Sequence, residues 1–296
     1  MPKFSEDQLN SFRLPPSDTE EQKLANAESQ IRDALSNSVS LQSKNYKIFG
    51  QGSYANDTNV RNNSDVDINV RLDDSVFVDL PPNKAYEDLG YYDTTYHYSN
   101  FRNDVLNALI ACFGTNSVQY NNKCITVLPN SYRVEIDVIP TCKYIRYDNG
   151  NSKVEGIKFF DKSYNSIVNF PLQHIQNGKD KNARTQKRFK RLTRIYRRIR
   201  YKMIEDTNSV SDHITSYLLE CLIWNVPDRI FNDYLTWTER LKQSIIYLYN
   251  NTETDEKCQD WGEVSELLYL FRGNRKWSVK DVNNYLVQMW QYLQFN

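Results

Sequence analysis

The sequence is poor in the residues that build zinc sites, disulfide frameworks and membrane spans. Its 296 residues include 5 cysteines and 3 histidines, and no CxxC or HExxH spacing occurs, which argues against the common zinc sites. The cysteine count is odd and no two cysteines are close in the chain, so we expect a reduced, cytoplasmic protein. No apolar run approaches roughly 18 residues, and the first residues lack a signal-peptide hydrophobic region. We therefore expect neither a membrane span nor Sec secretion.

An excess of charge of one sign is also missing. Lys plus Arg and Asp plus Glu both number 37, so the formal net charge is zero. This balance predicts no overall attraction to nucleic acid or to a membrane surface. Only 9 glycines and 9 prolines occur, and no internal repeat is visible, which excludes solenoids and low-complexity tails. The 40% hydrophobic and 25% charged composition is that of a globular protein with one large domain or two modest ones.

The first half of the chain predicts a mixture of helices and strands. Residues 17–20 read Ser-Asp-Thr-Glu, the form of a capping box, and apolar residues follow at helical spacing through Leu35. Residues 64–72 and 132–139 alternate between apolar and polar residues, which predicts two half-buried strands. We expect Pro140 to close the second strand. Between these strands, residues 101–114 are predicted to form a buried helix.

The second half predicts helices alone. Residues 181–203 are strongly basic and carry an apolar stripe at helical spacing, formed by Phe189, Leu192, Tyr196, Ile199 and Met203. Further helical patterns cover 211–224, 237–250, 263–271 and 279–293. We therefore predict an α+β protein with a sheet-containing domain over 1–170 and a helical domain over 171–296.

Three acidic residues stand out on the predicted strands. Asp65 and Asp67 share one strand face, about 6–7 Å apart along the backbone, and Asp137 lies on the second strand. Glu135 shares the face of Asp137, but we favour Asp137 because it lies closer to the strand's exit. Three carboxylates on adjacent strands could hold two Mg²⁺ ions about 3.5–4 Å apart, the arrangement used in phosphoryl displacement. The alternative is that these acids only keep an exposed strand face soluble.

A glycine–serine segment precedes these acids and favours the metal site. Gly50 and Gly52 allow a tight turn in which backbone N–H groups approach a phosphate, and the Ser53 hydroxyl adds another donor. Phosphate donors followed closely by a pair of carboxylates are what a metal–nucleotide site requires.

Taken together, Gly52-Ser53, Thr58, Ser64-Asp65-Val66-Asp67 and Asp137 resemble the nucleotidyltransferase signature of the DNA polymerase β-like superfamily. Within it, the chain most resembles the cGAS/DncV-like nucleotidyltransferases (CD-NTases) of bacterial anti-phage systems. The resemblance implies a polymerase β-like core, that is, a twisted mixed sheet with flanking helices, followed by a C-terminal helical lobe with the active-site cleft between the two. It also implies two Mg²⁺ ions, with Mn²⁺ as an alternative, at Asp65, Asp67 and Asp137.

The resemblance extends to the predicted helices. Arg194 and Arg197 match the spacing of the side chains that reach the triphosphate, although members of the family more often carry Lys at the second position. Ser216 would donate to a phosphate, and Tyr217 would stack on the donor base. The alternatives are that these arginines form the solvated face of a helix and that Tyr217 belongs to the core.

Residues 171–182 resemble the interdomain segment of one CD-NTase clade, clade E, in which an Asn favours pyrimidine bases. Asn177 and Asn182 are the two candidates, and the alternative for either is a helix cap. We expect His174 to be structural rather than a general base. Because the chain has no Cys/His zinc insertion, we do not expect activation by DNA.

The expected activity is the joining of NTPs (ATP with UTP, GTP or another NTP) into a cyclic di- or trinucleotide. This product would be a second messenger in anti-phage (CBASS) signalling, with regulatory or effector proteins of the same defence system as partners and no obligatory nucleic acid. One alternative is template-independent nucleotidyl transfer to RNA, tRNA or a protein. Another is a catalytically silent nucleotide-binding sensor.

Overall fold

The computed structural model describes residues 2–60, 66–81, 83–147 and 152–295. The chain divides into two compact units. The sheet unit comprises Ser17–Ala55 and Ser64–Pro171, and the helical unit comprises Met1–Pro16, Asn56–Asn63 and Leu172–Asn296. The prediction divides the chain into 1–170 and 171–296. Two short segments of 1–170, Met1–Pro16 and Asn56–Asn63, belong to the helical unit instead.

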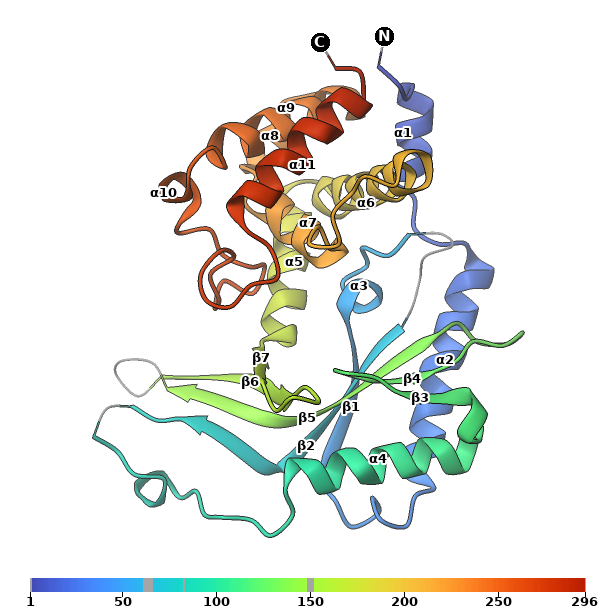
Figure 1. The fold of residues 1–296 in the computed structure, drawn as a ribbon, viewed down its shortest axis with the longest axis vertical. Helices are drawn as coiled ribbons and strands as arrows, with labels where there is room; N and C mark the ends of the chain where they lie inside the picture. The colour runs from blue at the N-terminus through green and yellow to red at the C-terminus, as the bar shows by residue number, and fades with distance from the viewer. Residues whose placement is uncertain (1, 61–65, 82, 148–151, 296) are drawn as a thin grey trace. The chain divides into compact units, whose positions relative to one another are not determined.

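A seven-stranded mixed sheet forms the sheet unit (Figure 1). Its main path runs β1-β2-β5-β4-β3, with β6 paired to β5 and β7 paired to β6. The central pair β2 and β5 is parallel, and the other pairs are antiparallel. The strands are β1 Tyr46–Gln51, β2 Val66–Asp79, β3 Val118–Tyr120, β4 Ile125–Val127, β5 Ile136–Tyr147, β6 Lys153–Phe160 and β7 Ser166–Asn169.

Helices α2 (Asp18–Ser36) and α4 (Tyr98–Phe113) supply the helical side of the core of this unit (Figure 1). The capping box predicted at Ser17 is confirmed, since Ser17 and Glu20 cap each other's backbone. Apolar side chains of both helices join the inward-facing residues of β2 and β5 in one buried cluster, so the opposite side of these strands is left to polar residues. The remaining short elements are α3 Gly52–Ala55, η1 Glu87–Leu89 and η2 Thr115–Ser117.

Strand β5 does not end at Pro140, which corrects the sequence prediction. Pro140 is buried within the strand and stands opposite Val70 of β2. On its other side, β5 pairs with β4 only up to Val138 and with β6 only from Cys142 onward. Because Pro140 lies in the gap between these two partners, its missing N–H interrupts neither ladder.

The helical unit packs its helices around a second apolar core. Its helices are α1 Glu6–Phe12, α5 Pro171–Arg184, α6 Arg188–Thr207, α7 Ser216–Trp224, α8 Asp228–Asn232, α9 Trp237–Asn251, α10 Asp255–Cys258 and α11 Val279–Tyr292. Helix α1 packs on α6 and α9 (Figure 1), and Glu6 accepts hydrogen bonds from the first backbone N–H groups of α9. No helix within the described ranges is long and apolar enough to cross a membrane.

The predicted basic helix over 181–203 is in fact the end of α5 followed by α6. Gln186 and Lys187 adopt positive φ angles of 52° and 65°, and this left-handed backbone separates α5 from α6. The predicted apolar stripe from Phe189 to Met203 is confirmed, since all five of its residues are buried. Residues 171–182, which resemble the interdomain segment of clade E, lie within helix α5.

The predicted helix over 263–271 is wrong. The segment folds back on itself: Gly262 pairs with Tyr269 in an isolated antiparallel bridge, and the N–H of Leu270 donates to the carbonyl of Trp261 at 2.7 Å. Glu266 has a positive φ of 59°, which a continuous right-handed helix excludes. Val264 and Leu270 are both fully buried although the segment folds back between them, so the spacing of its apolar residues imitates a helical pattern.

Candidate functional site

Asp67 and Asp137 stand opposite each other on the two central parallel strands of the sheet unit. Asp67 on β2 is the register partner of Asp137 on β5, and neighbouring strands lie about 4.7–4.9 Å apart. Both residues are partly exposed, on the side of the strands that faces away from α2 and α4. Glu135, the other acid considered at this position, precedes β5 and is exposed. Asp65, the third predicted acid, lies outside the described residues.

Gly52 brings the backbone up against the Asp67 carboxylate. It has a positive φ of 66°, and a Cβ atom at this position would lie 1.9 Å from Asp67 Oδ2. Only glycine allows both this conformation and this approach. Gly50 is different, because a Cβ there would lie 3.5 Å from the Ala55 Cβ, an ordinary van der Waals contact. Ser53 follows Gly52 in the short helix α3 and is partly exposed.

A hydroxyl on β4 holds the Asp137 carboxylate in place. The Thr126 hydroxyl lies 2.5 Å from Asp137 Oδ1, and the Asn121 Nδ2 donates to the Thr126 Oγ1 at 2.8 Å. A hydroxyl has one hydrogen, so with Asn121 donating to its oxygen, Thr126 directs that hydrogen to Asp137. Thr126 was not among the predicted residues. Its β-branched neighbours indicate a strand, but nothing in the sequence pairs this strand with β5.

Cys124 lies beside the same group and stays protonated. Its Sγ is 3.7 Å from the Thr126 Oγ1. Burial, together with the negative charges of Asp137 and Asp67, raises the pKa of the Cys124 thiol to about 12. A thiol held in this form is a poor nucleophile. Carboxylate oxygens are the harder ligands, which Mg²⁺ prefers.

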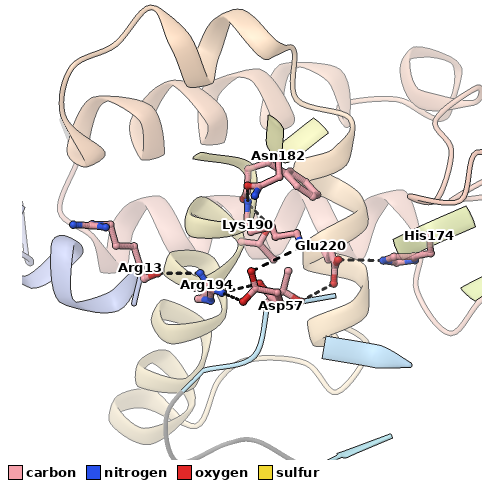
Figure 2. A network of polar contacts seen from close by, with 10 residues as sticks. Arg13, Asp57, His174, Asn182, Lys190, Arg194 and Glu220 are labelled. Atoms are coloured by element: carbon pink, nitrogen blue, oxygen red, sulfur yellow. Dashed lines mark hydrogen bonds and ion pairs between the residues drawn. The ribbon is translucent and has the colours of Figure 1, made fainter. Parts of the chain in front are cut away.

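The predicted triphosphate residues Arg194 and Arg197 are buried rather than solvated, on helix α6. Figure 2 shows Arg194 donating to the Asp57 carboxylate and to the backbone carbonyls of Asp57 (2.8 Å) and Arg13 (3.3 Å). Lys190, one turn earlier on α6, lies 3.9 Å from the other oxygen of the Asp57 carboxylate. Burial lowers the pKa of Arg194 and of Lys190, and the Asp57 charge opposes this effect in both.

Two buried arginine donors in this group lack an acceptor. Among the described residues, neither the Nε of Arg194 nor the Nε of Arg197 has a hydrogen-bond partner. Buried donors are usually satisfied, and an exception calls for an acceptor supplied from elsewhere. An anion is the acceptor that matches a guanidinium. The burial of both arginines argues against the alternative of a solvated helix face, and their role in binding phosphate stays a prediction.

Glu220 connects three segments of the helical unit (Figure 2). It is fully buried on α7, and its carboxylate accepts from the Thr58 hydroxyl at 3.1 Å and lies 3.1 Å from the His174 Nε2. Burial acts to raise the pKa of Glu220, but His174, Arg197 and Thr58 outweigh it and hold this pKa below its ordinary value. His174 is thus a buried partner of a carboxylate, in agreement with the structural role expected for it.

Ser216 and Tyr217 begin helix α7. The Ser216 Oγ lies 3.4 Å from the Tyr201 hydroxyl. The Tyr217 hydroxyl donates to the Glu263 carboxylate at 2.7 Å, while 37% of the residue stays exposed. The rings of His174 and Trp277 lie near it, at centroid distances of 5.7 and 6.3 Å. Tyr217 is therefore anchored at its hydroxyl end and only partly covered.

The two candidate asparagines have different surroundings on helix α5. The Asn182 Oδ1 accepts from the backbone N–H of Lys190 at 3.2 Å, so it satisfies one of the free N–H groups at the start of α6. The Asn177 Nδ2 donates to the carbonyl of Val264 at 2.9 Å, which fixes the orientation of its amide. Asn182 therefore has the helix-cap role that was the alternative for both asparagines.

Comparison with known proteins identifies relatives over the whole chain. Residues 176–294 match the model of the cGAS/DncV-like nucleotidyltransferase C-terminal helical domain. A cyclic dipyrimidine nucleotide synthase CdnE from Cecembia lonarensis is 57% identical over 295 residues and is matched over 100% of both chains. A cyclic dipurine nucleotide synthase from Elizabethkingia meningoseptica is 35% identical, with 99% of each chain covered.

Solved structures agree with this assignment. The structure of Elizabethkingia meningoseptica CdnE cyclic dinucleotide synthase with GTP and Apcpp has a TM-score of 0.84 and 34% identity, covering 99% of this chain and 100% of the other. The structure of Rhodothermus marinus CdnE c-UMP-AMP synthase with Apcpp and Upnpp also has a TM-score of 0.84, with 26% identity and 97% coverage of both chains. From its fold, its helical domain and its full-length relatives, the chain belongs to the cGAS/DncV-like nucleotidyltransferases.

Proposed function

We propose that this chain joins NTPs into a cyclic di- or trinucleotide in a divalent-metal-dependent nucleotidyl transfer. The observation that carries the proposal is the register of Asp67 opposite Asp137 on parallel strands, with the Gly52 backbone against the Asp67 carboxylate. The family resemblance adds that the product would be a second messenger in cytoplasmic anti-phage signalling, read by partner proteins of the same defence system.

The acids of the sheet unit fit divalent ions. Asp67, Asp137 and Asp65 would hold two Mg²⁺ ions, or Mn²⁺ in their place, since these ions prefer oxygen ligands. Within the described ranges no group of three His, Cys, Asp or Glu side chains could hold a metal, and the third acid of this proposal, Asp65, lies outside them. Bound ions would neutralise charge on the triphosphate and lower the pKa of the attacking hydroxyl.

Each unit, taken by itself, carries donors that we propose for phosphate. Ser53 and the Gly52 backbone would serve the sheet unit, and Ser216, Arg194 and Arg197 the helical unit. The buried, unpartnered Nε atoms of the two arginines support this role, because a phosphate supplies the acceptors that they lack. A phosphate bound to Arg194 would compete with Asp57, which now occupies that guanidinium.

The bases would be recognised by Tyr217 and Asn177. Stacking on an aromatic ring is tolerant of base identity and contributes about 1–3 kcal/mol, so the choice of base requires polar contacts. We choose Asn177 over Asn182 because Asn182 caps the start of α6 through its Oδ1. Asn177 is bound through its Nδ2, at the Val264 carbonyl, so its Oδ1 is the atom proposed to face a base. We propose pyrimidine nucleotides as substrates, a choice supported by the dipyrimidine synthase from Cecembia lonarensis, which is 57% identical.

The chemistry would then follow from these placements. A ribose hydroxyl of one nucleotide attacks the α-phosphorus of the other, a new O–P bond forms, and the bond to pyrophosphate breaks. Asp137, oriented by Thr126, would accept the hydroxyl proton, and the arginines would stabilise charge on the phosphates. A second attack within the linear intermediate would close the ring and release a second pyrophosphate.

The test is to incubate the protein with Mg²⁺ and mixed NTPs, and to measure pyrophosphate release and products by mass spectrometry. The wild-type chain is expected to release pyrophosphate and make phosphatase-resistant cyclic products, whereas Asp67→Asn and Asp137→Asn abolish both. Asp93→Asn, which alters an exposed acid of the same unit, is the control and should remain active. Unchanged turnover in Asp67→Asn contradicts the site.

Two further outcomes of the same experiment would support the other functions considered. Pyrophosphate release and nucleotide transfer that occur only when RNA, tRNA or a protein is supplied would indicate a different acceptor. Nucleotide binding without pyrophosphate release in the wild-type protein would indicate a silent sensor.

A further inference from the structure

Three consecutive residues of the helical unit, Gly262–Val264, each receive a side-chain hydrogen bond from a neighbouring helix or its cap. Asn225, which caps the C-terminus of α7, donates to the carbonyl of Gly262 at 2.9 Å. Tyr217 at the start of α7 donates to the Glu263 carboxylate at 2.7 Å. Asn177 of α5 donates to the carbonyl of Val264 at 2.9 Å.

The segment that receives these bonds is itself rigidly held. The backbone N–H of Glu263 donates to the carbonyl of Leu268 at 2.9 Å, and the N–H of Leu270 donates to that of Trp261 at 2.7 Å. Val264 is fully buried in the core of the unit. The segment is therefore a fixed frame rather than a loop that adapts to the helices.

Glu263 is the central residue of this frame. It is a carboxylate that is only 2% exposed, and both of its oxygens are used, one by the Tyr217 hydroxyl and the other by Arg275 at 2.6 Å. Burial and the nearby negative charge raise the pKa of Tyr217 well above its ordinary value, so the hydroxyl remains a donor. With its hydroxyl fixed in this way, the Tyr217 ring has one tilt, set between His174 and Trp277.

We propose that the Gly262–Val264 segment positions both base-contacting side chains and so sets the nucleotide preference, with Glu263 as the positioning residue for Tyr217. This inference rests on the function proposed above, in which Tyr217 stacks on a base and Asn177 contacts a base edge. Stacking depends on the tilt of the ring, and reading a base edge depends on which way the amide faces. Val264 determines which way the Asn177 amide faces, because the Val264 carbonyl requires the nitrogen of that amide and not its oxygen.

The experiment uses the full-length chain and three variants. Tyr217→Phe keeps the ring and removes the hydroxyl, Glu263→Gln removes the charge, and Asn225→Ala releases the other end of the segment. Tyr292→Phe is the matched control, because the Tyr292 hydroxyl of α11 also donates to a carboxylate at 2.7 Å, that of Asp206 on α6. Binding of non-hydrolysable UTP and ATP analogues is measured by calorimetry, and KM, kcat and product ratios are measured with each NTP pair.

Tyr217→Phe and Glu263→Gln are expected to raise Kd and KM by about 10- to 100-fold, as the loss of a hydrogen bond to a charged group implies. Asn225→Ala loses a bond between neutral groups and should raise them by about 2- to 10-fold. All three variants should change the ratio of products. Their kcat at saturating nucleotide stays within about threefold of wild type, because the reacting groups lie elsewhere. The double variant Tyr217→Phe/Glu263→Gln should bind little worse than either single variant. Tyr292→Phe should bind and react as the wild type does.

Nucleotide affinity and product ratios that match the wild type in all three variants would overturn the inference. So would equal effects in the three variants and in Tyr292→Phe, because this would indicate general destabilisation. Failure of the proposed function has a different signature, in which the wild-type chain binds nucleotide but releases no pyrophosphate. In that case the calorimetry of the variants still decides whether the segment positions the base contacts.

Discussion

At the scale of single residues, the identity of Gly52 and of Thr126 is explained by what each does to an acid. Gly52 leaves room for the Asp67 carboxylate, and Thr126 donates to Asp137. Both are requirements of geometry, since one concerns a missing Cβ atom and the other a single hydroxyl hydrogen. Each requirement can be tested by a substitution with a matched control.

Gly52→Ala should inactivate the protein, whereas Gly50→Ala should not. The added Cβ would lie 1.9 Å from Asp67 Oδ2 and would occupy a backbone with φ of 66°, so the carboxylate must move. A left-handed backbone costs a non-glycine residue about 1–2 kcal/mol, and this loss should appear in denaturant unfolding. Gly50, two residues earlier, has room for a Cβ. Equal activity of the two variants would contradict the role given to Gly52.

Thr126→Val should lower activity, whereas Thr126→Ser should keep most of it. Valine has the shape of threonine but cannot donate to Asp137, and serine can. A hydrogen bond to a charged group contributes about 1.5–3 kcal/mol, so kcat should fall by about 10- to 100-fold in the valine variant. The Mn²⁺ affinity, measured by electron paramagnetic resonance, should fall with it. If the valine variant matches the serine variant in both measurements, Thr126 does not position Asp137.

At the scale of elements, the accuracy of the sequence predictions depended on how local their signals are. The capping box at Ser17 and the apolar stripe of α6 depend on neighbours a few positions away, and both predictions are confirmed. The expectation that Pro140 ends β5 is wrong for a non-local reason. The strand tolerates this proline because it lies between the residues that pair with β4 and those that pair with β6, and this pairing cannot be read from neighbouring residues. The break between α5 and α6 lies at Gln186 and Lys187, two residues whose side chains do not signal a left-handed backbone.

Helix α5 carries a buried lysine with a consequence for pH dependence. The Lys181 ammonium donates to the carbonyls of Trp224 and Val226 at 2.7 Å and pairs with Asp228. Burial, only partly opposed by Asp228, lowers the pKa of Lys181 from 10.5 to about 8. In the unfolded chain its pKa is ordinary, about 10.4. Between about pH 8 and 10 the unfolded chain therefore binds more protons than the folded protein.

Unfolding should consequently become less favourable in this window as the pH rises. The free energy of unfolding of the wild type, relative to that of Lys181→Met, should increase by about 3 kcal/mol between pH 7 and pH 10.5. Denaturant titrations of both proteins at several pH values measure this difference, and the methionine variant removes the contribution of every other group. A difference that does not depend on pH would show that Lys181 keeps an ordinary pKa in the folded protein.

At the scale of the whole molecule, the sequence was sufficient for the fold class and the family but not for the contacts that position the site. The mixed sheet, the helical domain and the membership of the cGAS/DncV-like nucleotidyltransferases agree with the resemblance carried by Gly52-Ser53, Asp67 and Asp137. Thr126, Asp57 and Glu263 were not found. Asp57 and Glu263 lie 137 and 46 residues from Arg194 and Tyr217, the residues that they contact. Thr126 contacts Asp137 because β4 pairs with β5, and no spacing along the chain marks that pairing.

Metal binding by Asp67 and Asp137 can be observed in a diffraction experiment. Crystals of the chain with Mn²⁺ and a non-hydrolysable UTP analogue would be measured at a wavelength at which manganese scatters anomalously. Anomalous peaks are expected about 2.0–2.4 Å from carboxylate oxygens of Asp67 and Asp137, next to the triphosphate. A bound nucleotide with manganese peaks only at other residues, and none at these two, would contradict this role of the two acids.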